Sequence, residues 1–326
     1  MSTLIPPDVY MTDRNYMVDN YPMIIGFTVA GTIDALGAGI DDLMQGDRVT
    51  AFTYLDFSNR AMQEYSVQPR SVVSKIPDSL SLEEAATLPD NFVCAFYVLF
   101  NQLGLPVPSS FPVSDSPPLA DTPILIYGAS STVGVYAVQL LQLAGYKKII
   151  ATASTRNHEY LKSLGATATF DYNSASLNDD IAKFVGGDGK VPLALDCISA
   201  ESTLGILGKI IGSQGKVAVL LPIKEGSTVT GSGEQEMYWE LPEGKNPFEK
   251  TTQIIYIRTF QYQNDEYLKK NLMPKILPSL LQSGFIKPSR VRLLDEGSFK
   301  ERVEAGLELL RNNKVSGEKV IVKITA

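Results

Sequence analysis

The sequence holds very little of the chemistry from which metal sites and hydrolytic sites are built. Its 326 residues include one histidine, His158, and two cysteines, Cys94 and Cys197. A histidine- and cysteine-rich metal site cannot be assembled from this set, and a Ser-His or Cys-His hydrolase would have only one candidate base. Two distant cysteines could form at most one disulfide, so we expect both to be buried small side chains in a cytoplasmic protein.

Net positive charge and long apolar runs are also missing. The 29 Lys and Arg against 36 Asp and Glu give a net charge of −7, which opposes attraction to nucleic acid and to anionic membranes. No run approaches the roughly 18 apolar residues of a membrane span, and residues 1–8 carry no basic leader. The apolar content of 44% is typical of a globular protein, and at roughly 150 residues per domain the length predicts two domains.

What is clearly present is an alternation of β-branched runs and helical periods between Pro123 and Leu221. The runs predict strands at Ile124–Tyr127, Lys148–Ala153, Ala168–Phe170, Leu193–Cys197 and Lys216–Leu221, with a sixth at Ile254–Ile257. The helical periods predict helices at Val133–Leu143, Asn157–Leu164, Leu177–Val185 and Ser202–Ile211. This order is typical of a parallel sheet with right-handed crossovers.

The two ends of the chain have a different pattern. Strands are predicted within the first 80 residues at Ile24–Leu36, Arg48–Phe52 and Tyr65–Val67, separated by glycines and acidic turns. Leu82–Leu103 is helical in pattern and is followed by a proline- and serine-rich loop. Phe299 to Leu310 has helical spacing and Val320–Ile324 predicts a final strand. Lys224–Lys250 is either a lid that faces substrate or a surface excursion.

A small-residue turn follows the first strand of the alternating region. Gly128 and Gly134 bracket it, and Ser131 occupies the position of the middle glycine of the dinucleotide fingerprint. Small residues let the backbone approach a pyrophosphate at a helix N-terminus, although they also permit tight packing of a helix on a strand. Because the turn opens a series of strand–helix units, we interpret it as a phosphate-binding turn.

The end of the second strand bears on the choice of cofactor. An unphosphorylated ribose usually requires an acidic residue about 20 residues after the turn, and Ser154 stands there instead, close to Arg156. A hydroxyl and a guanidinium suit a 2′-phosphate, so NADPH is favoured over NADH. Alternatively, Ser154 and Thr155 only cap the next helix. His158 is expected to be exposed or adenine-facing rather than catalytic.

These features, with the β-rich module before them, resemble the medium-chain dehydrogenase/reductase family from about Pro6 to the end of the chain. In the zinc alcohol dehydrogenase branch a Gly-His-Glu segment supplies a metal ligand, whereas Phe27 and Thr28 stand there in this chain, so no catalytic zinc is expected. Within the zinc-independent branch the chain resembles fungal trans-acting enoyl reductases of polyketide biosynthesis. The motifs that carry this likeness are Tyr127-Gly-Ala-Ser-Ser, Ala153-Ser-Thr-Arg-Asn157, Phe170-Asp-Tyr172, Ala194-Leu-Asp-Cys-Ile198 and Ser316-Gly-Glu-Lys319.

The resemblance implies an α/β fold, a Rossmann-type doubly wound parallel sheet joined to a GroES-like β-rich domain. The GroES-like domain is expected at residues 1–95 and 288–326, and the NADP-binding domain at residues 96–287. Family members have more β-structure before the segment that Pro6–Tyr10 matches, so we expect the β-rich domain to be truncated at its N-terminus. The residues expected to contact NADPH are Gly128, Ser130, Ser131, Thr132, Val133, Ser154, Thr155, Arg156, Asn157, Tyr172, Leu220, Leu221, Ser316 and Gly317.

Tyr10 and Tyr127 are the candidate catalytic residues, as proton donors or hydrogen-bond donors. Tyr10 sits near the position of a lysine that related reductases place beside the nicotinamide. Each tyrosine could equally be a packed ring, and water could supply the proton instead.

Three functions remain open from the sequence. The first is an NADPH-dependent enoyl reductase on α,β-unsaturated thioesters, acting in trans on a polyketide synthase. The second is a quinone or enone reductase of the same branch. The third is a non-redox catalyst or binding protein on a former reductase fold. A monomer and a homodimer are both compatible with the sequence, since the strand at Ile254–Ile257 could pair across a dimer axis.

Overall fold

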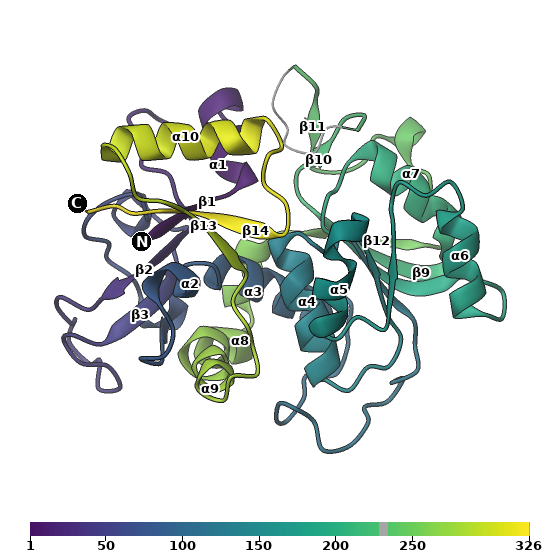
Figure 1. The fold of residues 1–326 in the computed structure, drawn as a ribbon, viewed down its shortest axis with the longest axis horizontal. Helices are drawn as coiled ribbons and strands as arrows, with labels where there is room; N and C mark the ends of the chain where they lie inside the picture. Colours follow the sequence, from purple (N-terminus) through teal and green to yellow (C-terminus); the bar gives the residue numbers. More distant parts are fainter. Residues whose placement is uncertain (228–233, 326) are drawn as a thin grey trace. The chain divides into compact units, whose positions relative to one another are not determined.

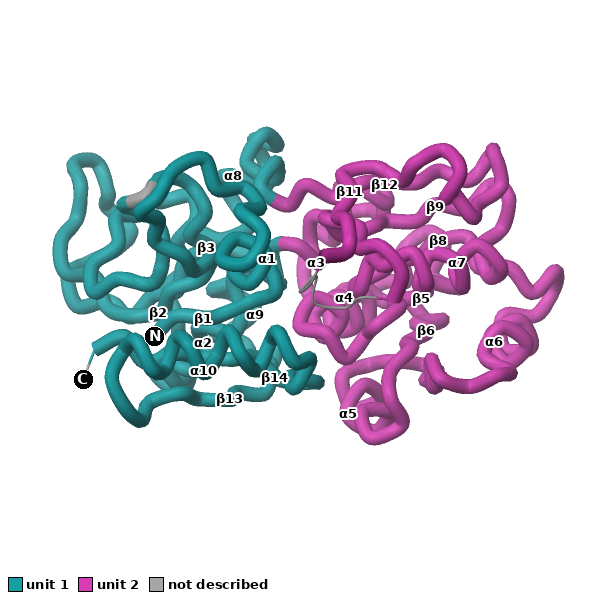
Figure 2. The backbone as a smooth tube through the Cα atoms, turned by 90° about the horizontal axis from the view of Figure 1, so that it is seen from above, with its two compact units in different colours: residues 1–93, 230–232, 260–326 teal, residues 94–229, 233–259 magenta. Residues whose placement is uncertain are grey.

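The computed structural model describes residues 1–227 and 234–325, which form two compact units (Figure 2). Unit 1 comprises residues 1–93 and 260–325, and unit 2 comprises residues 94–227 and 234–259. The sequence assigns residues 260–287 to the nucleotide-binding domain, whereas in this division they lie with unit 1. Part of the Lys224–Lys250 excursion, residues 228–233, lies outside the described residues.

Unit 2 is built on the predicted parallel sheet. Its six strands lie in the order β12-β9-β8-β5-β6-β7, and every neighbouring pair is parallel. The strands are β5 (Ile124–Tyr127), β6 (Ile149–Thr152), β7 (Ala168–Phe170), β8 (Val191–Asp196), β9 (Ile211–Leu220) and β12 (Gln253–Ile257). The apolar residues of β5 form continuous runs because both faces of a parallel sheet are covered; Ile124, Leu125 and Ile126 are fully buried.

Four helices connect these strands. They are α4 (Thr132–Leu143), α5 (His158–Ser163), α6 (Leu177–Val185) and α7 (Glu201–Ile210). Figure 1 shows α4 and α5 on one side of this unit and α6 and α7 on the other. The strand order reverses between β5 and β8, so a ligand crevice is expected at the carboxyl ends of these two strands. The predicted Rossmann-type sheet is confirmed.

Unit 1 contains a second six-stranded sheet, in the order β13-β14-β1-β2-β3-β4. Its strands are β1 (Ser2–Leu4), β2 (Thr28–Thr32), β3 (Arg48–Phe52), β4 (Val73–Lys75), β13 (Arg290–Leu294) and β14 (Glu318–Val322). The β1 strand pairs antiparallel with both β14 and β2. Segments from the two ends of the chain therefore share one sheet, in which β13 and β4 are the edges.

One sequence prediction for unit 1 is wrong. No strand forms at Tyr65–Val67, where Tyr65 is 72% exposed and Val67 is 70% exposed; the alternating residues have no core to face. The helical pattern of Leu82–Leu103 is confirmed, with a break before Pro89: it forms α2 (Leu82–Ala85), α3 (Pro89–Tyr97) and a π-helical turn at Val98–Gln102. Pro89 starts α3 because it lacks an N–H group and suits the first position of a helix.

Helices that the sequence did not predict cover the sheet of unit 1. They are α1 (Pro6–Arg14), α8 (Glu266–Asn271) and α9 (Leu277–Gln282), while the predicted C-terminal helix is α10 (Phe299–Arg311). The Ser74 hydroxyl in β4 donates to the carbonyl of Met273, and Arg70 Nη2 lies 3.4 Å from the carbonyl of Pro274. These bonds explain why residues 260–287 cluster with unit 1. No helix among the described residues is long and apolar enough to cross a membrane.

Candidate active site

The turn after β5 is tied to the end of β6. Gly128 has a φ of +72°, which favours glycine, and its N–H donates to the Thr152 hydroxyl at 3.0 Å. The next N–H, of Ala129, donates to the Thr152 carbonyl at 2.8 Å. Thr152, which the sequence did not single out, thus fixes the start of the turn that carries the predicted Gly128, Ser130, Ser131, Thr132 and Val133.

The turn leads into α4 in the manner that an anion site requires. Ser131 is the N-cap, and its hydroxyl accepts from the Gly134 N–H at 3.2 Å. The N–H groups of Thr132 and Val133 have no partner inside the helix, since they lie in its first turn. A Cβ on Gly134 would lie 2.6 Å from the Ala129 backbone, so glycine permits this close approach of helix and turn. The cradle fits the pyrophosphate of a dinucleotide.

The loop after β8 packs directly against this turn. Tyr127 and Asp196 are partners at the ends of β5 and β8, and a Cβ on Gly128 would lie 2.6 Å from the Ile198 side chain. The buried Asp196 shapes the loop: its carboxylate accepts from the N–H groups of Ile198 and Ser199 at 2.9 and 3.0 Å. It also accepts from the Thr203 hydroxyl at 2.5 Å. Burial raises the pKa of Asp196, and these hydrogen bonds oppose the shift.

A buried lysine that the sequence reasoning missed joins the loops after β8 and β9. Lys224 lies in β10 (Ile223–Lys224), and its ammonium donates to the Ile198 carbonyl and lies 3.5 Å from the Pro222 carbonyl. Its own N–H donates to the Ser199 carbonyl at 2.9 Å. Burial lowers the pKa of Lys224 to about 8. The predicted Leu220 ends β9, and Leu221 follows it and forms the cis peptide bond to Pro222. No sequence motif marks Lys224 as part of the site; its hydrogen bonds to backbone carbonyls in the structure do.

The residues predicted to contact the ribose lie together after the ends of the neighbouring strands β6 and β7. The Ser154 hydroxyl is 3.1 Å from that of Tyr172, and Thr155–Asn157 form one 3-10 turn before α5. Arg156 is exposed. His158 is half-buried, and its Nε2 lies 3.0 Å from the Ala153 carbonyl of the same loop. The carboxylate of Asp171 nearby accepts from the Asn173 N–H at 2.9 Å.

The predicted catalytic tyrosines are both buried. Tyr127 ends β5 within the apolar core of unit 2 and is 4% exposed. Tyr10 lies in α1, is 3% exposed and packs edge-on against Tyr16. Burial raises the pKa of each phenol, so both stay protonated as hydrogen-bond donors and are weak acids. Tyr10, like the predicted Ser316 and Gly317 before β14, belongs to unit 1, so its place beside a cofactor stays a prediction.

Comparison with known proteins identifies the family. A family model described as "Alcohol dehydrogenase GroES-like domain" matches residues 1–78, and one described as "Zinc-binding dehydrogenase" matches residues 132–227. A trans-enoyl reductase of Gibberella fujikuroi is 32% identical over 92% of this chain and 83% of its own length. The chain belongs to the medium-chain dehydrogenase/reductase family. Members of this family are oxidoreductases that use a nicotinamide cofactor.

Two further members of the medium-chain dehydrogenase/reductase family resemble this chain, one in sequence and one in fold. The enoyl reductase component of the lovastatin nonaketide synthase of Aspergillus terreus is 30% identical over 92% of this chain and 81% of its own length. The fold matches an Escherichia coli quinone oxidoreductase, solved in complex with NADPH, with a TM-score of 0.71 and 19% identity. That alignment covers 98% of this chain and 89% of the bacterial one.

In this medium-chain dehydrogenase/reductase, Phe27 and Thr28 stand where the zinc branch has its ligand motif, and both make contacts within unit 1. Phe27 is 2% exposed and lies under the Arg60 guanidinium, and the Thr28 hydroxyl donates to Asp90 Oδ1 at 3.1 Å. Within residues 1–227 and 234–325, no three His, Cys, Asp or Glu side chains lie close enough together to hold a metal ion.

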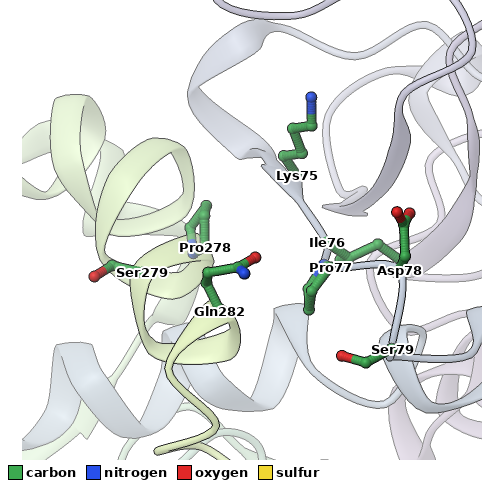
Figure 3. Close-up of a pocket in the computed structure, with 8 residues that line it drawn as sticks. All are labelled: Lys75, Ile76, Pro77, Asp78, Ser79, Pro278, Ser279 and Gln282. Atoms are coloured by element: carbon green, nitrogen blue, oxygen red, sulfur yellow. The ribbon is translucent and has the colours of Figure 1, made fainter.

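One open pocket of about 650 Å³ lies in unit 1, and none of the predicted site residues lines it (Figure 3). It lies between the segment after β4 and α9, and its lining residues are Lys75, Ile76, Pro77, Asp78, Ser79, Pro278, Ser279 and Gln282. Figure 3 shows Lys75 and Ser279 pointing away from one another. We assign no chemistry to this pocket.

Proposed function

We propose that this oxidoreductase is an NADPH-dependent enoyl reductase that acts on α,β-unsaturated thioesters. The observation that supports NADPH is the hydroxyl pair of Ser154, after β6, and Tyr172, after β7, with the exposed Arg156 in the turn that follows Ser154. Hydroxyls and a guanidinium donate hydrogen bonds to a 2′-phosphate, whereas a carboxylate in place of Ser154 would repel it. The names of the relatives support the enoyl substrate.

The residues around the turn would hold the cofactor in the following way. The N–H groups of Thr132 and Val133 bind the pyrophosphate, and the Gly128 and Gly134 positions leave room for it. Ser154, Arg156 and Tyr172 bind the 2′-phosphate. When bound, NADPH supplies the hydride that the β-carbon of an enoyl thioester accepts.

Reduction leaves negative charge on the thioester oxygen, and donors near that oxygen stabilise it. Tyr127 and Tyr10 are proposed as such hydrogen-bond donors, since their raised pKa values keep the phenols protonated. Water is the alternative source of the proton on the α-carbon. We further propose that a polyketide synthase presents the acyl chain in the cytoplasm, and that the protein works as a monomer or a homodimer.

The test is an NADPH titration followed by turnover against parallel panels of enoyl thioesters and quinones. We expect NADPH to bind and its 340 nm absorbance to fall with enoyl thioesters. Faster turnover of aryl quinones than of any enoyl thioester would favour the second function, which the fold shared with quinone oxidoreductase supports. Failure to bind NADPH would leave the non-redox function.

The cofactor preference has its own test in Arg156→Glu. A carboxylate in place of this exposed guanidinium repels the 2′-phosphate, so the KM for NADPH should rise roughly 10- to 100-fold while that for NADH changes little. Lys162→Glu is the matched control, because Lys162 is also exposed and basic but lies in α5 beyond the turn. An equal loss for both cofactors in Arg156→Glu would contradict the assignment.

A further inference from the structure

Five aromatic rings of unit 1 pack into one cluster, which we call the aromatic cluster. It consists of Phe27, Phe52, Tyr54, Phe260 and Tyr262. Phe260 lies at its centre, with ring centroids 5.9 Å from Phe27, 5.9 Å from Phe52 and 5.0 Å from Tyr54, each in a stacked arrangement. Tyr54 and Phe260 are half-buried, so the cluster reaches the surface of the unit.

A buried arginine lies over one end of the aromatic cluster. The guanidinium carbon of Arg60 is 4.7 Å from the centroid of the Phe27 ring, and the residue is only 6% exposed. Its Nη1 is buried and donates to no described group. The negative charge of Asp8 acts on Arg60, but this carboxylate already accepts from the N–H groups of Ile5 and Gly26 at 2.8 and 2.9 Å. Arg60 therefore keeps a donor for which the described residues provide no acceptor.

This arrangement is costly unless a ligand completes it. A guanidinium stays charged in proteins, and a buried donor without an acceptor costs about 1–3 kcal/mol, more when it is charged. The Phe27 ring face offsets part of this cost but accepts no conventional hydrogen bond. A charged donor beside stacked rings suits a flat molecule that carries a polar oxygen.

We propose that Arg60 and the aromatic cluster form the acyl-binding site of unit 1. Arg60 Nη1 donates to the carbonyl oxygen of a conjugated acyl thioester, and the half-buried rings of Tyr54 and Phe260 stack on its conjugated carbons. The identity of the ligand rests on the proposed function, because the enoyl thioester is its substrate. The site itself rests on the geometry of Arg60 and the five rings.

The first experiment measures binding without turnover. A sorbyl thioester of N-acetylcysteamine, a conjugated dienoyl compound, is titrated into the full chain in the absence of NADPH, and its ultraviolet absorbance is followed. Hydrogen bonding of the carbonyl to a cation should shift the absorbance to longer wavelength. Arg60→Met should weaken binding roughly 10- to 100-fold and abolish the shift, whereas Arg60→Lys should recover part of both. NADPH affinity should stay unchanged, since its proposed residues lie in other segments.

Arg258→Met is the matched control. Arg258 also lies over an aromatic ring, 5.9 Å from the centroid of Trp239, but is exposed. Its loss should change neither the sorbyl affinity nor the absorbance shift. If Arg60→Met fails to fold, Phe260→Leu at the half-buried ring replaces it. That variant should lower the affinity for the sorbyl thioester more than for its saturated hexanoyl counterpart.

The outcomes separate this site from the proposed function. Binding that depends on Arg60 without any NADPH oxidation would retain the site and overturn the enoyl reductase. Turnover of enoyl thioesters that is unchanged in Arg60→Met would retain the reductase and overturn the site. No binding of the sorbyl thioester by the wild-type chain, or equal loss in Arg258→Met and Arg60→Met, would also overturn the site.

Discussion

At the scale of single residues, Lys224 makes the least expected contribution to the nucleotide site. Its ammonium holds the Ile198 carbonyl, and the Ile198 side chain packs on Gly128 at the start of the phosphate-binding turn. Burial works against the charge, as the pKa of about 8 indicates. Burial makes the charged ammonium costly in the folded state. The free energy of unfolding therefore increases as the pH rises from 8 to the unfolded pKa of Lys224 near 10.5. The role of Lys224 is therefore better explained by its positioning of the loop after β8 than by a gain in stability.

Replacing Lys224 tests this positioning role. Lys224→Met should weaken NADPH binding roughly 10-fold, because the loop after β8 loses the charged hydrogen bond that places Ile198. In the wild type the affinity should fall as the pH rises through 8, where the ammonium loses its proton, and this dependence should vanish in Lys224→Met. Lys190→Met is the control, since Lys190 lies directly before β8 but is exposed and donates to the Lys209 carbonyl rather than to the Ile198 carbonyl. An unaltered pH profile of NADPH affinity in Lys224→Met would contradict the role.

At the scale of elements, the β5–turn–α4 unit depends on the close approach of α4 to the turn that precedes it. A Cβ on Gly134 would meet backbone atoms of Ala129 at 2.6 Å, and backbone cannot give way as a flexible side chain can. Gly205 in α7 has nothing within 4 Å of the same position. The two glycines therefore form a matched pair in helices of the same unit.

We expect opposite results from alanine at these two glycines. Gly134→Ala should lower the free energy of unfolding by about 1–3 kcal/mol and abolish NADPH binding, because α4 must move away from the turn. Gly205→Ala should raise the free energy of unfolding by about 0.5–1 kcal/mol through helix propensity and leave NADPH binding intact. Thermal unfolding with and without NADPH measures both effects. Gly134→Ala with wild-type affinity would contradict the packing argument.

The same unit shows which parts of the fold a sequence can predict. Strands β5 and β7 and helix α6 begin and end where the sequence patterns predict, because β-branched runs and helical periods alternate here and turn residues separate them. Tyr65–Val67 shows the limit, since alternation alone does not reveal whether a core lies beneath it. The turn residues could be predicted from local chemistry. Lys224 and Arg60 could not, because their roles come from carbonyls and rings that lie far away in the sequence.

At the scale of the whole molecule, unit 1 is assembled from two segments of chain that lie far apart in sequence. A buried ion pair joins them: the Lys319 ammonium in β14 donates to Asp90 Oδ1 at the start of α3, and to Asn91 Oδ1 at 2.8 Å. Lys319 is 2% exposed and Asp90 is 4% exposed. Burial lowers the pKa of Lys319, and Asp90 opposes that shift. Each charge is tolerated only because the other is present.

Breaking this pair should therefore destabilise unit 1 far more than removing both charges. Lys319→Met leaves Asp90 buried and uncompensated and should cost about 3–5 kcal/mol, a large part of a typical domain's stability. The double variant Asp90→Asn/Lys319→Met should recover most of this loss, since Asn can still accept from the Thr28 hydroxyl. Urea unfolding of the two single variants and the double variant gives the coupling energy. Additive losses would mean that the pair does not hold the two segments of unit 1 together.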